Sequence, residues 1–290
     1  MNSCIHLPTA RLIDYVYCYI VIDNDYSAVQ HQIGIEMYPN GLSGICFSFG
    51  DHYRYTNDHG KESQFGAGAV AIGLHNCIFN LHPSKIQKHI VITFRQGFLP
   101  KLLRTSMHAL NDQVVDLNSF IHIHGSLTEQ LADASSSAEQ IALIEDWLWD
   151  QIKDKPFYNT ITDCVVSDIL KASGDVKIED LCNQYHINKK YIERQFKEHI
   201  GVTPKRYAEL VKLNAVLNQL ILSYESRWKD ISLETGFNDY SHLKKHTSKF
   251  TNQSPQMLKQ KLFQSFAKGA VTNNLLGMLN SLCLSKEIFE

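Results

Sequence analysis

The 290-residue sequence contains no uninterrupted apolar run of about 18 or more residues, which is the length that a transmembrane helix requires. Its first segment, MNSCIHLPTARLIDY, has neither the basic start nor the apolar stretch of a secretory signal. The seven cysteines are odd in number and form no Cys-x-x-Cys pair, which argues against a disulfide framework or a zinc ribbon. We therefore expect a cytoplasmic protein, kept in a reducing environment, that has no membrane partner.

The sequence also lacks a catalytic constellation of paired acids and bases. Ten of the 14 histidines precede residue 125, and His122 and His124 have the His-x-His spacing that some metal-binding strands use. No third histidine or glutamate follows at the spacing of a further ligand, since the next acid is Glu129. We expect no enzyme activity, no cofactor and no metal, and we interpret these histidines as surface or loop residues.

Period-two patterns, which are typical of β-strands, fill residues 1–110. The clearest are YVYCYIVID (15–23), SGICFSFG (43–50) and HIVITFRQG (89–97). Turn signals such as YPNG and NDHG separate the runs. Many short strands of this kind predict a small β-barrel or sandwich, followed by a short helix over residues 100–107.

The segment SSSAEQIALIEDWLWDQIKD (135–154) opens on serines that can cap a helix and then shows helical periodicity. Its apolar stripe consists of Ile141, Ile144, Leu148 and Ile152. The stripe has two interpretations: it covers the sheet of its own chain, or it forms the interface of a dimer. We expect this helix to close a first domain, residues 1–154.

After a connection at 153–163, the sequence predicts helices and no strands. The expected helices cover residues 163–172, 178–184, 189–199, 205–222, 228–235, 240–250 and 255–266. We expect an all-α domain over 158–264 and a helical tail over 265–290, whose apolar stripe includes Leu275 and Leu279. The predicted fold is therefore α+β, with a β-rich domain followed by a helical one.

The two halves differ in charge. Residues 1–154 hold 9 Lys and Arg against 16 Asp and Glu, whereas residues 155–262 hold 17 against 12. The net charge of −2 thus conceals an acidic half and a basic half. Unequal charge between two domains can arise by chance, but the basic half also contains a repeated pattern.

The repeat consists of NKKYIERQFKEHIGVTPKRY (188–207) and DYSHLKKHTSKFTNQSPQML (239–258), whose matching positions are 51 residues apart. Each copy begins with a residue that can cap a helix and ends with a hydroxyl residue before proline. Each is preceded by a short amphipathic segment, IEDLCNQY or WKDISLETGF, with Cys182 or Ser232 as a small inward-facing residue. A short helix, a tight turn and an exposed basic helix form a helix-turn-helix, which places its second helix in the major groove of DNA.

Both copies carry most of a known pattern. The first has Asn188, Ile192, Arg194, Phe196, Lys197, Gly201, Thr203 and Pro204, and the second has Gly236, Phe237, Asp239, Ser241, His242, Ser254 and Pro255. On these residues, 163–262 resembles the DNA-binding domain of the AraC/XylS family of transcription regulators. The second copy departs from the family at Leu243, Lys245, Thr247 and Asn252. These departures put its base reading in doubt more than its fold, because Asn can take the left-handed conformation of the usual glycine.

The resemblance implies a set of DNA contacts by position in the two motifs. Residues facing bases would be Lys189, Lys190, Glu193 and Arg194 in the first copy, and Tyr240, Ser241, Lys244 and Lys245 in the second. Lys197 and Lys249 would contact phosphates. The helix at 205–222 would hold the two copies apart, so that one chain could grip successive turns of double-stranded DNA.

Residues 10–120 loosely resemble the sensor domains of some family members, through YPNGLSGICFSFGD and VITFRQGFLPKLL. This likeness implies a domain for effector binding or association, without naming an effector. The leading hypothesis is a bacterial transcription activator that binds promoter DNA and RNA polymerase, as a monomer or as a homodimer through its N-terminal domain. One alternative is a partner- or ligand-regulated interaction module with degraded DNA specificity, and another is a barrel enzyme fused to a helical domain.

Overall fold

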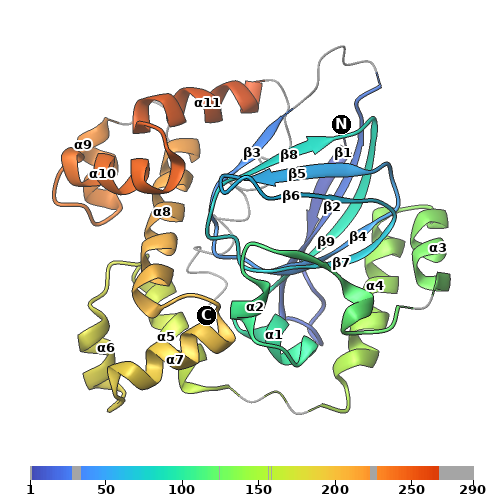
Figure 1. Ribbon diagram of the computed structural model, residues 1–290, viewed down its shortest axis with the longest axis horizontal. Helices are drawn as coiled ribbons and strands as arrows, with labels where there is room; N and C mark the ends of the chain where they lie inside the picture. The colour runs from blue at the N-terminus through green and yellow to red at the C-terminus, as the bar shows by residue number, and fades with distance from the viewer. Residues whose placement is uncertain are drawn as a thin grey trace.

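The computed structural model describes residues 2–27, 34–123, 125–155, 157, 159–222 and 227–267. A sheet-rich N-terminal region is followed by a helical C-terminal region that lies beside it (Figure 1). This arrangement confirms the predicted α+β class. None of the described helices is both long and apolar enough to cross a membrane.

The strands of the N-terminal region pair antiparallel in two sheets. The six-stranded sheet has the order β1 (Asn2–His6), β2 (Val16–Asp25), β9 (Ile86–Phe94), β4 (Gly44–Ser48), β7 (Gly68–Ile72) and β10 (Val114–Asp116). The four-stranded sheet has the order β3 (Ile35–Met37), β8 (Phe79–Pro83), β5 (Tyr53–Asn57) and β6 (Glu62–Phe65). The strongest sequence patterns, at 15–23, 43–50 and 89–97, correspond to β2, β4 and β9, which are three adjacent inner strands of the larger sheet.

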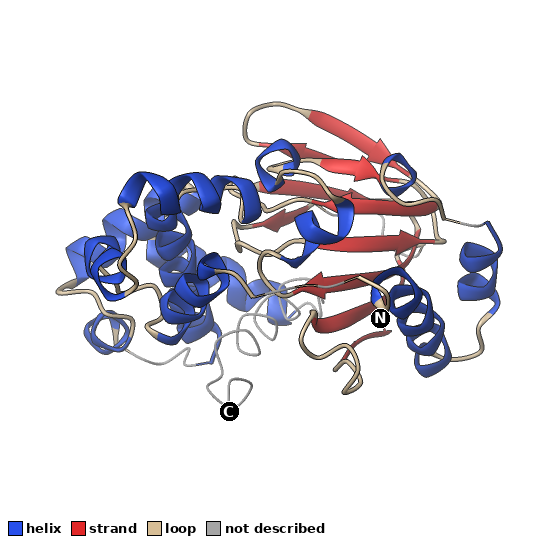
Figure 2. Ribbon diagram, turned by 90° about the horizontal axis from the view of Figure 1, so that it is seen from below, coloured by secondary structure: helices blue, strands red, loops and turns tan. Residues whose placement is uncertain are grey.

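The strands of both sheets lie on one side of the molecule, beside the helical region (Figure 2), and both faces of the six-stranded sheet are covered. On one face, Cys46 of β4 lies 3.8 Å from the Tyr53 hydroxyl of the second sheet. On the other face, the ring of Phe47 meets Trp147 edge-on at 5.3 Å. Every residue of β4 is buried because both faces of its sheet are covered.

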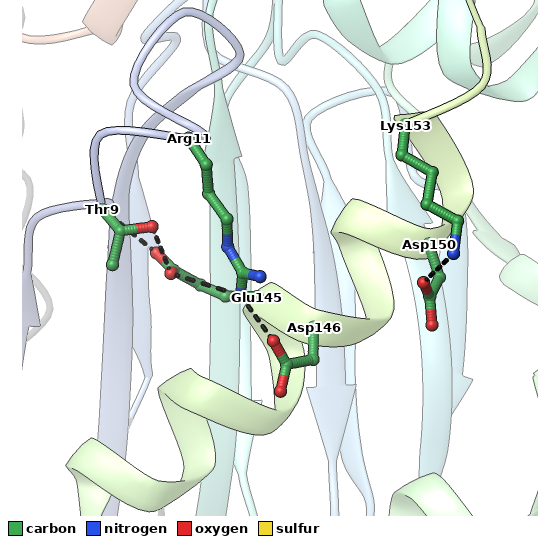
Figure 3. A network of polar contacts seen from close by, with 6 residues as sticks. All are labelled: Thr9, Arg11, Glu145, Asp146, Asp150 and Lys153. Carbon is green, nitrogen blue, oxygen red and sulfur yellow. Dashed lines mark hydrogen bonds and ion pairs between the residues drawn. The ribbon is translucent and has the colours of Figure 1, made fainter.

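The helix α4 (Ser137–Ile152) covers the outer face of the larger sheet. Its predicted stripe, Ile141, Ile144, Leu148 and Ile152, is buried in the core of the same chain. The buried carboxylate of Glu145 accepts hydrogen bonds from the backbone N and the hydroxyl of Thr9, at 2.9 and 2.6 Å (Figure 3). The apolar stripe of α4 therefore covers the sheet of its own chain, which was the first of its two interpretations.

The helix expected at 100–107 is divided in the structure. One helix, α1, covers Phe98–Leu103, and a second, α2, covers Met107–Leu110. The break lies at Arg104, which has a left-handed φ of 53° and whose N–H reaches the Pro100 carbonyl. A further helix, α3 (Gly125–Asp133), lies where no separate helix is predicted. Residues 121–123 are not a strand, and His124, the second histidine of the His-x-His pattern, lies outside the described residues.

The helical region follows its sequence periodicity closely. Its helices are α5 (Ile161–Lys171), α6 (Ile178–Gln184), α7 (Lys189–His199), α8 (Pro204–Leu222), α9 (Trp228–Glu234), α10 (Tyr240–Thr251) and α11 (Pro255–Ala267). Each described end lies within two residues of its expected position. The helical core also contains Tyr38, Leu74 and Ile78 from the sheet region, so the two regions share a packed boundary. The helical tail expected beyond Ala267 lies outside the described residues.

Candidate nucleic-acid interface

The first helix-turn-helix consists of α6, a short turn and α7. Its small inward residue, Cys182, is buried, and its carbonyl accepts a hydrogen bond from the N–H of Ile187 at 2.9 Å. His186 takes a left-handed φ of 53° in the turn. The buried side chains of Ile192 and Phe196 then anchor α7, so that its opposite face points to solvent.

The second helix-turn-helix, made of α9, a turn and α10, repeats this geometry with one extra residue. Ser232 is buried like Cys182, and its carbonyl accepts from the N–H of Phe237 at 2.8 Å. Gly236 takes the left-handed conformation of His186, with a φ of 72°. These pairs are 50 positions apart, whereas the caps of the following helices are 51 apart. The second turn is therefore longer by one residue before its basic helix begins.

The residues at the ends of the two basic helices cap them, as the sequence predicts. The Asn188 side chain accepts a hydrogen bond from the N–H of Lys190, and Asp239 accepts one from the N–H of His242, each at 2.8 Å. A cap of this type contributes about 1 kcal/mol to its helix. Asn252 closes α10 in the left-handed conformation, with a φ of 54°, so it takes the place of the family's glycine without losing the turn.

The predicted contact residues lie on the exposed faces of α7 and α10. The side chains of Lys189, Lys190, Arg194 and Lys197 on α7 are exposed, as are those of Ser241, Lys244, Lys245 and Lys249 on α10. Glu193 and Tyr240 are half-buried. Tyr240 packs its ring 5.4 Å from that of Trp228, so part of its surface is already covered by its own motif.

Some of these cations already have partners. The Lys189 ammonium lies 2.6 Å from Glu179, and the Lys249 ammonium lies 2.7 Å from Glu209. The guanidinium of Arg194 lies 5.7 Å from the centre of the Tyr191 ring. Exposed ion pairs contribute only about 0–1 kcal/mol, so a phosphate could replace Glu179 or Glu209 at little cost. Within the described chain, no ion pair engages Lys190, Lys197, Lys244 or Lys245.

The second motif packs differently from the first at one core position. Thr247 is fully buried where the family pattern has phenylalanine. Nearby, the His246 ring lies 5.2 Å from Phe237 and 5.0 Å from Phe250, and so forms part of an aromatic cluster. Burial lowers the pKa of His246 to about 4, which keeps the ring neutral at pH 7. Phe250 is buried as expected and helps to fill the region around Thr247.

Comparison with known proteins identifies the family. A model described as a helix-turn-helix domain matches residues 181–261, which include most of the first motif and all of the second, and a model described as a domain of unknown function matches residues 5–116. The chain is 26% identical over 135 residues to the HTH-type transcriptional activator RhaS of Escherichia coli O139:H28. The chain belongs to the AraC/XylS family of transcription regulators. The RhaS match spans 47% of this chain and 40% of the relative.

Other similar proteins match this AraC/XylS chain at lower sequence identity. RhaS of Shigella boydii serotype 18 is 25% identical over the same share of both chains. The solved structure of ToxT from Vibrio cholerae covers 79% of this chain and 97% of ToxT, with 13% identity and a TM-score of 0.45. The AraC-like transcriptional activator CuxR covers 67% of this chain and 80% of its own, with 13% identity and a TM-score of 0.30.

The structure adds candidates that sequence reasoning missed in this AraC/XylS chain. Tyr191 is exposed on α7 beside Arg194, and His242 is exposed on the first turn of α10. Lys205 is exposed at the start of α8, immediately after the first motif. Helical spacing from Arg194 could have revealed Tyr191, because residues three apart share a helix face.

A cavity of about 790 Å³ lies between the sheet region and α5. Its walls include the rings of Tyr15, Tyr17, Phe98 and Phe157 and the cationic groups of Arg95, Lys101 and Lys171. Arg95 lies over the Tyr17 ring at 5.0 Å and donates from Nε to the Ile13 carbonyl at 2.6 Å. Lys101 pairs with Asp163 of α5 at 2.9 Å. The cavity is thus lined by both regions of this AraC/XylS protein.

A group with potential metal ligands occurs elsewhere, at Asp58, His59 and Cys77, whose ligand atoms all lie within 4.8 Å of one another. Burial and the carboxylates of Asp112 and Asp58 raise the pKa of the Cys77 thiol well above its ordinary value. The neutral thiol donates to Asp112 at 3.3 Å, so its present role is a hydrogen bond. The geometry alone therefore gives no reason to assign a metal to this group.

Proposed function

We propose that the protein is a sequence-specific transcription regulator whose α7 and α10 enter successive major grooves of double-stranded DNA. One observation carries this proposal: a capped helix with an exposed basic face occurs at each end of α8. The 19 residues of α8 span roughly 28 Å at 1.5 Å per residue, and major-groove faces recur about every 34 Å. A single chain could therefore contact two adjacent turns of one face of the duplex.

The exposed residues suggest a division of roles. Arg194 could grip a guanine with two hydrogen bonds, and Lys190 could reach a neighbouring base. Lys244 and Lys245 carry compact charges that would favour phosphates or single base acceptors. Lys197 and Lys249, placed further along their helices, would neutralise phosphates.

We further propose that the protein activates transcription in the bacterial cytoplasm together with RNA polymerase. The support is its likeness to RhaS, a protein described as a transcriptional activator. Since one chain supplies both motifs, a monomer would be sufficient for binding, and the stripe of α4 is already used within its own core. Size measurement in the presence and absence of DNA would test this stoichiometry.

A small effector would fit the cavity between the sheet region and α5. The aromatic walls favour an apolar body, and the charged groups of the lining, three cations and the three carboxylates of Asp14, Asp163 and Asp168, favour a polar head. A molecule there would contact both regions and could change how they sit together. A metabolite screen that reports melting temperature would reveal such a ligand, because binding to the folded state stabilises it by mass action.

Selection from a randomised duplex pool tests the main proposal. The protein should enrich a bipartite sequence. Its affinity for that sequence should fall steeply as the salt concentration rises, because the release of counterions from DNA into the buffer then contributes less free energy. Weak binding to all duplexes with no enriched sequence would instead favour an interaction module with degraded DNA specificity. Absence of salt-dependent binding to any duplex would refute both forms of DNA recognition.

A further inference from the structure

The sheet region holds both helix-turn-helix motifs at the equivalent turn. In the first motif, the Asn111 side chain donates to the carbonyl of Gly201, which lies between α7 and α8. In the second, the Gln253 side chain donates to Glu36 at 2.9 Å and to the Tyr38 hydroxyl at 3.2 Å. Gly201 corresponds to Asn252 at the 51-residue offset, so Gln253 is the next residue of the same turn. Two unrelated parts of the sheet region therefore contact one repeated feature.

The helix between the motifs is fixed to the sheet region as well. Arg206 donates from Nε to the Asn76 side chain at 2.7 Å and from Nη2 to the Asn76 carbonyl at 3.1 Å. About two turns further along α8, Asn214 donates to the Asn40 carbonyl at 2.7 Å. The second motif packs on α8 through both α9 and α10, and its contacts with the sheet region add to that packing.

The second motif meets the sheet at a four-residue cluster, Glu36, Tyr38, Gln253 and Lys261, which we call the Glu36 cluster. One carboxylate oxygen of Glu36 accepts from the Tyr38 hydroxyl at 2.6 Å, from Gln253 at 2.9 Å and from the Lys261 ammonium at 3.0 Å. Burial favours a raised pKa for Glu36, but the hydrogen bonds from Tyr38, Lys261 and Gln253 outweigh it and lower the pKa below its ordinary value. Glu36 is therefore ionised at pH 7 and accepts charge-assisted hydrogen bonds from both α11 and the α10–α11 turn.

A small rotation of the second motif would matter for DNA. The 12 residues of α10 span roughly 18 Å, and a rotation of about 10° moves the far end of such a helix by about 3 Å. Successive bases along one strand are about 3.4 Å apart. The contacts that set this angle thus decide which base pair meets Lys244 and Lys245.

We propose that Glu36 is a positioning residue that fixes the angle of the second motif and thereby the half-site spacing that the protein accepts. The proposal rests on the DNA-binding function proposed above. Glu36 lies on β3 and on neither recognition helix, so its effect on DNA is exerted through Gln253 and Lys261. Loss of the cluster should broaden the accepted spacing while each motif keeps its own sequence preference.

The test compares the wild type with Glu36→Ala and Glu36→Gln, using the randomised duplex pool. Glu62→Gln is the matched control, because Glu62 is an exposed glutamate of the same small sheet that pairs with Arg54. The wild type and the control should enrich one spacing between the two half-sites. Glu36→Ala should enrich spacings changed by one base pair in either direction, and its preference for the original spacing should fall roughly tenfold, as expected for loss of a charge-assisted hydrogen bond.

Further variants distinguish a positioning role of Glu36 from a general loss of folded structure. Affinity for a duplex with the first half-site alone should change less than twofold in Glu36→Ala, since α7 and Asn111 are untouched. Lys261→Ala should broaden spacing in the same direction, even if Glu36→Ala folds poorly. The exchanged pair Glu36→Lys with Lys261→Glu should recover part of the wild-type spacing preference, which a purely structural defect would not do.

The outcomes distinguish the two proposals. If the wild type enriches a bipartite site and folded Glu36→Ala and Lys261→Ala keep its single spacing, the role of Glu36 is refuted and the DNA-binding function stands. If the wild type enriches no sequence, the DNA-binding function fails and the role of Glu36 fails with it. Equal loss of affinity for single and paired half-sites in both variants would also refute positioning.

Discussion

Replacing Arg194 and Lys245 in turn should separate base recognition from phosphate attraction. Arg194 is exposed on α7, and its guanidinium lies 5.7 Å from the centre of the Tyr191 ring, which restricts its motion before DNA arrives. A bidentate contact of arginine with guanine is worth about 1–3 kcal/mol of discrimination, or about 5- to 150-fold in affinity. Lys245 is exposed, but it offers a compact charge without a planar fork.

The expected results differ in kind. Arg194→Ala should lose about 1–3 kcal/mol on the selected sequence and much less on a scrambled duplex. Arg194→Lys should lose most of the same discrimination yet keep the salt dependence, because the charge remains. Lys245→Ala should weaken both duplexes similarly and reduce the slope of log affinity against log salt by about one unit.

Fluorescence anisotropy with both duplexes over a salt series measures all three quantities. Arg54→Ala is the control, since Arg54 is an exposed arginine of β5 that pairs with Glu62 in the sheet region. It removes the same charge without touching either motif. If Lys245→Ala abolishes discrimination while Arg194→Ala preserves it, the roles assigned to the two motifs are reversed.

Four further predictions concern folding. Residues 158–264 expressed alone should give a helical circular dichroism spectrum and bind DNA; a disordered fragment would contradict the proposed domain boundary. Asn252→Gly should stabilise the protein against urea and Asn252→Ala should destabilise it by about 1 kcal/mol, because a left-handed φ of 54° penalises a side chain that cannot bond locally. Thr247→Val should raise the unfolding free energy by about 1 kcal/mol, since the buried hydroxyl has no partner among the described residues; a loss would contradict this. His75 is buried and burial lowers its pKa to about 4, so the unfolded state binds a proton first as the pH falls below about 6.5. The unfolding free energy should therefore decrease as the pH is lowered from about 6.5 to about 4. Urea titrations at several pH values should show a smaller decrease for His75→Phe.

The helical region was predictable because its signals are local. Asn188 and Asp239 cap their helices within three residues, and the apolar periodicity from Ile192 to Phe196 identifies the buried face of α7. The strongly β-branched strands were found for a similar reason. The other strands were not assigned individually; β1, β3 and β6, for example, are only three to five residues long and carry polar residues in their interiors. The contact residues named from the family motif stay predictions, although most lie on the exposed faces.

The contacts between regions were beyond the reach of sequence patterns. Glu36 and Gln253 are 217 residues apart, and neither carries a signal in its own neighbourhood. Asn111 and Gly201 are 90 apart, and only the fold shows that a side chain at Gly201 would collide with Asn111 while its φ is +98°. Packing at such distances depends on the orientation of whole elements, which periodicity does not specify.

The unequal copies of the motif fit this pattern of contacts. The first motif has Phe196 in its core and Arg194 on its surface, whereas the second has Thr247 and Lys245 at the corresponding positions. A smaller core side chain gives a helix less apolar area with which to fix its own angle. The second motif is also the one whose turn and following helix are held by an ionised carboxylate of the sheet region, Glu36. The contacts of Glu36 would then add orientation to the second motif, which its smaller core side chain fixes less firmly.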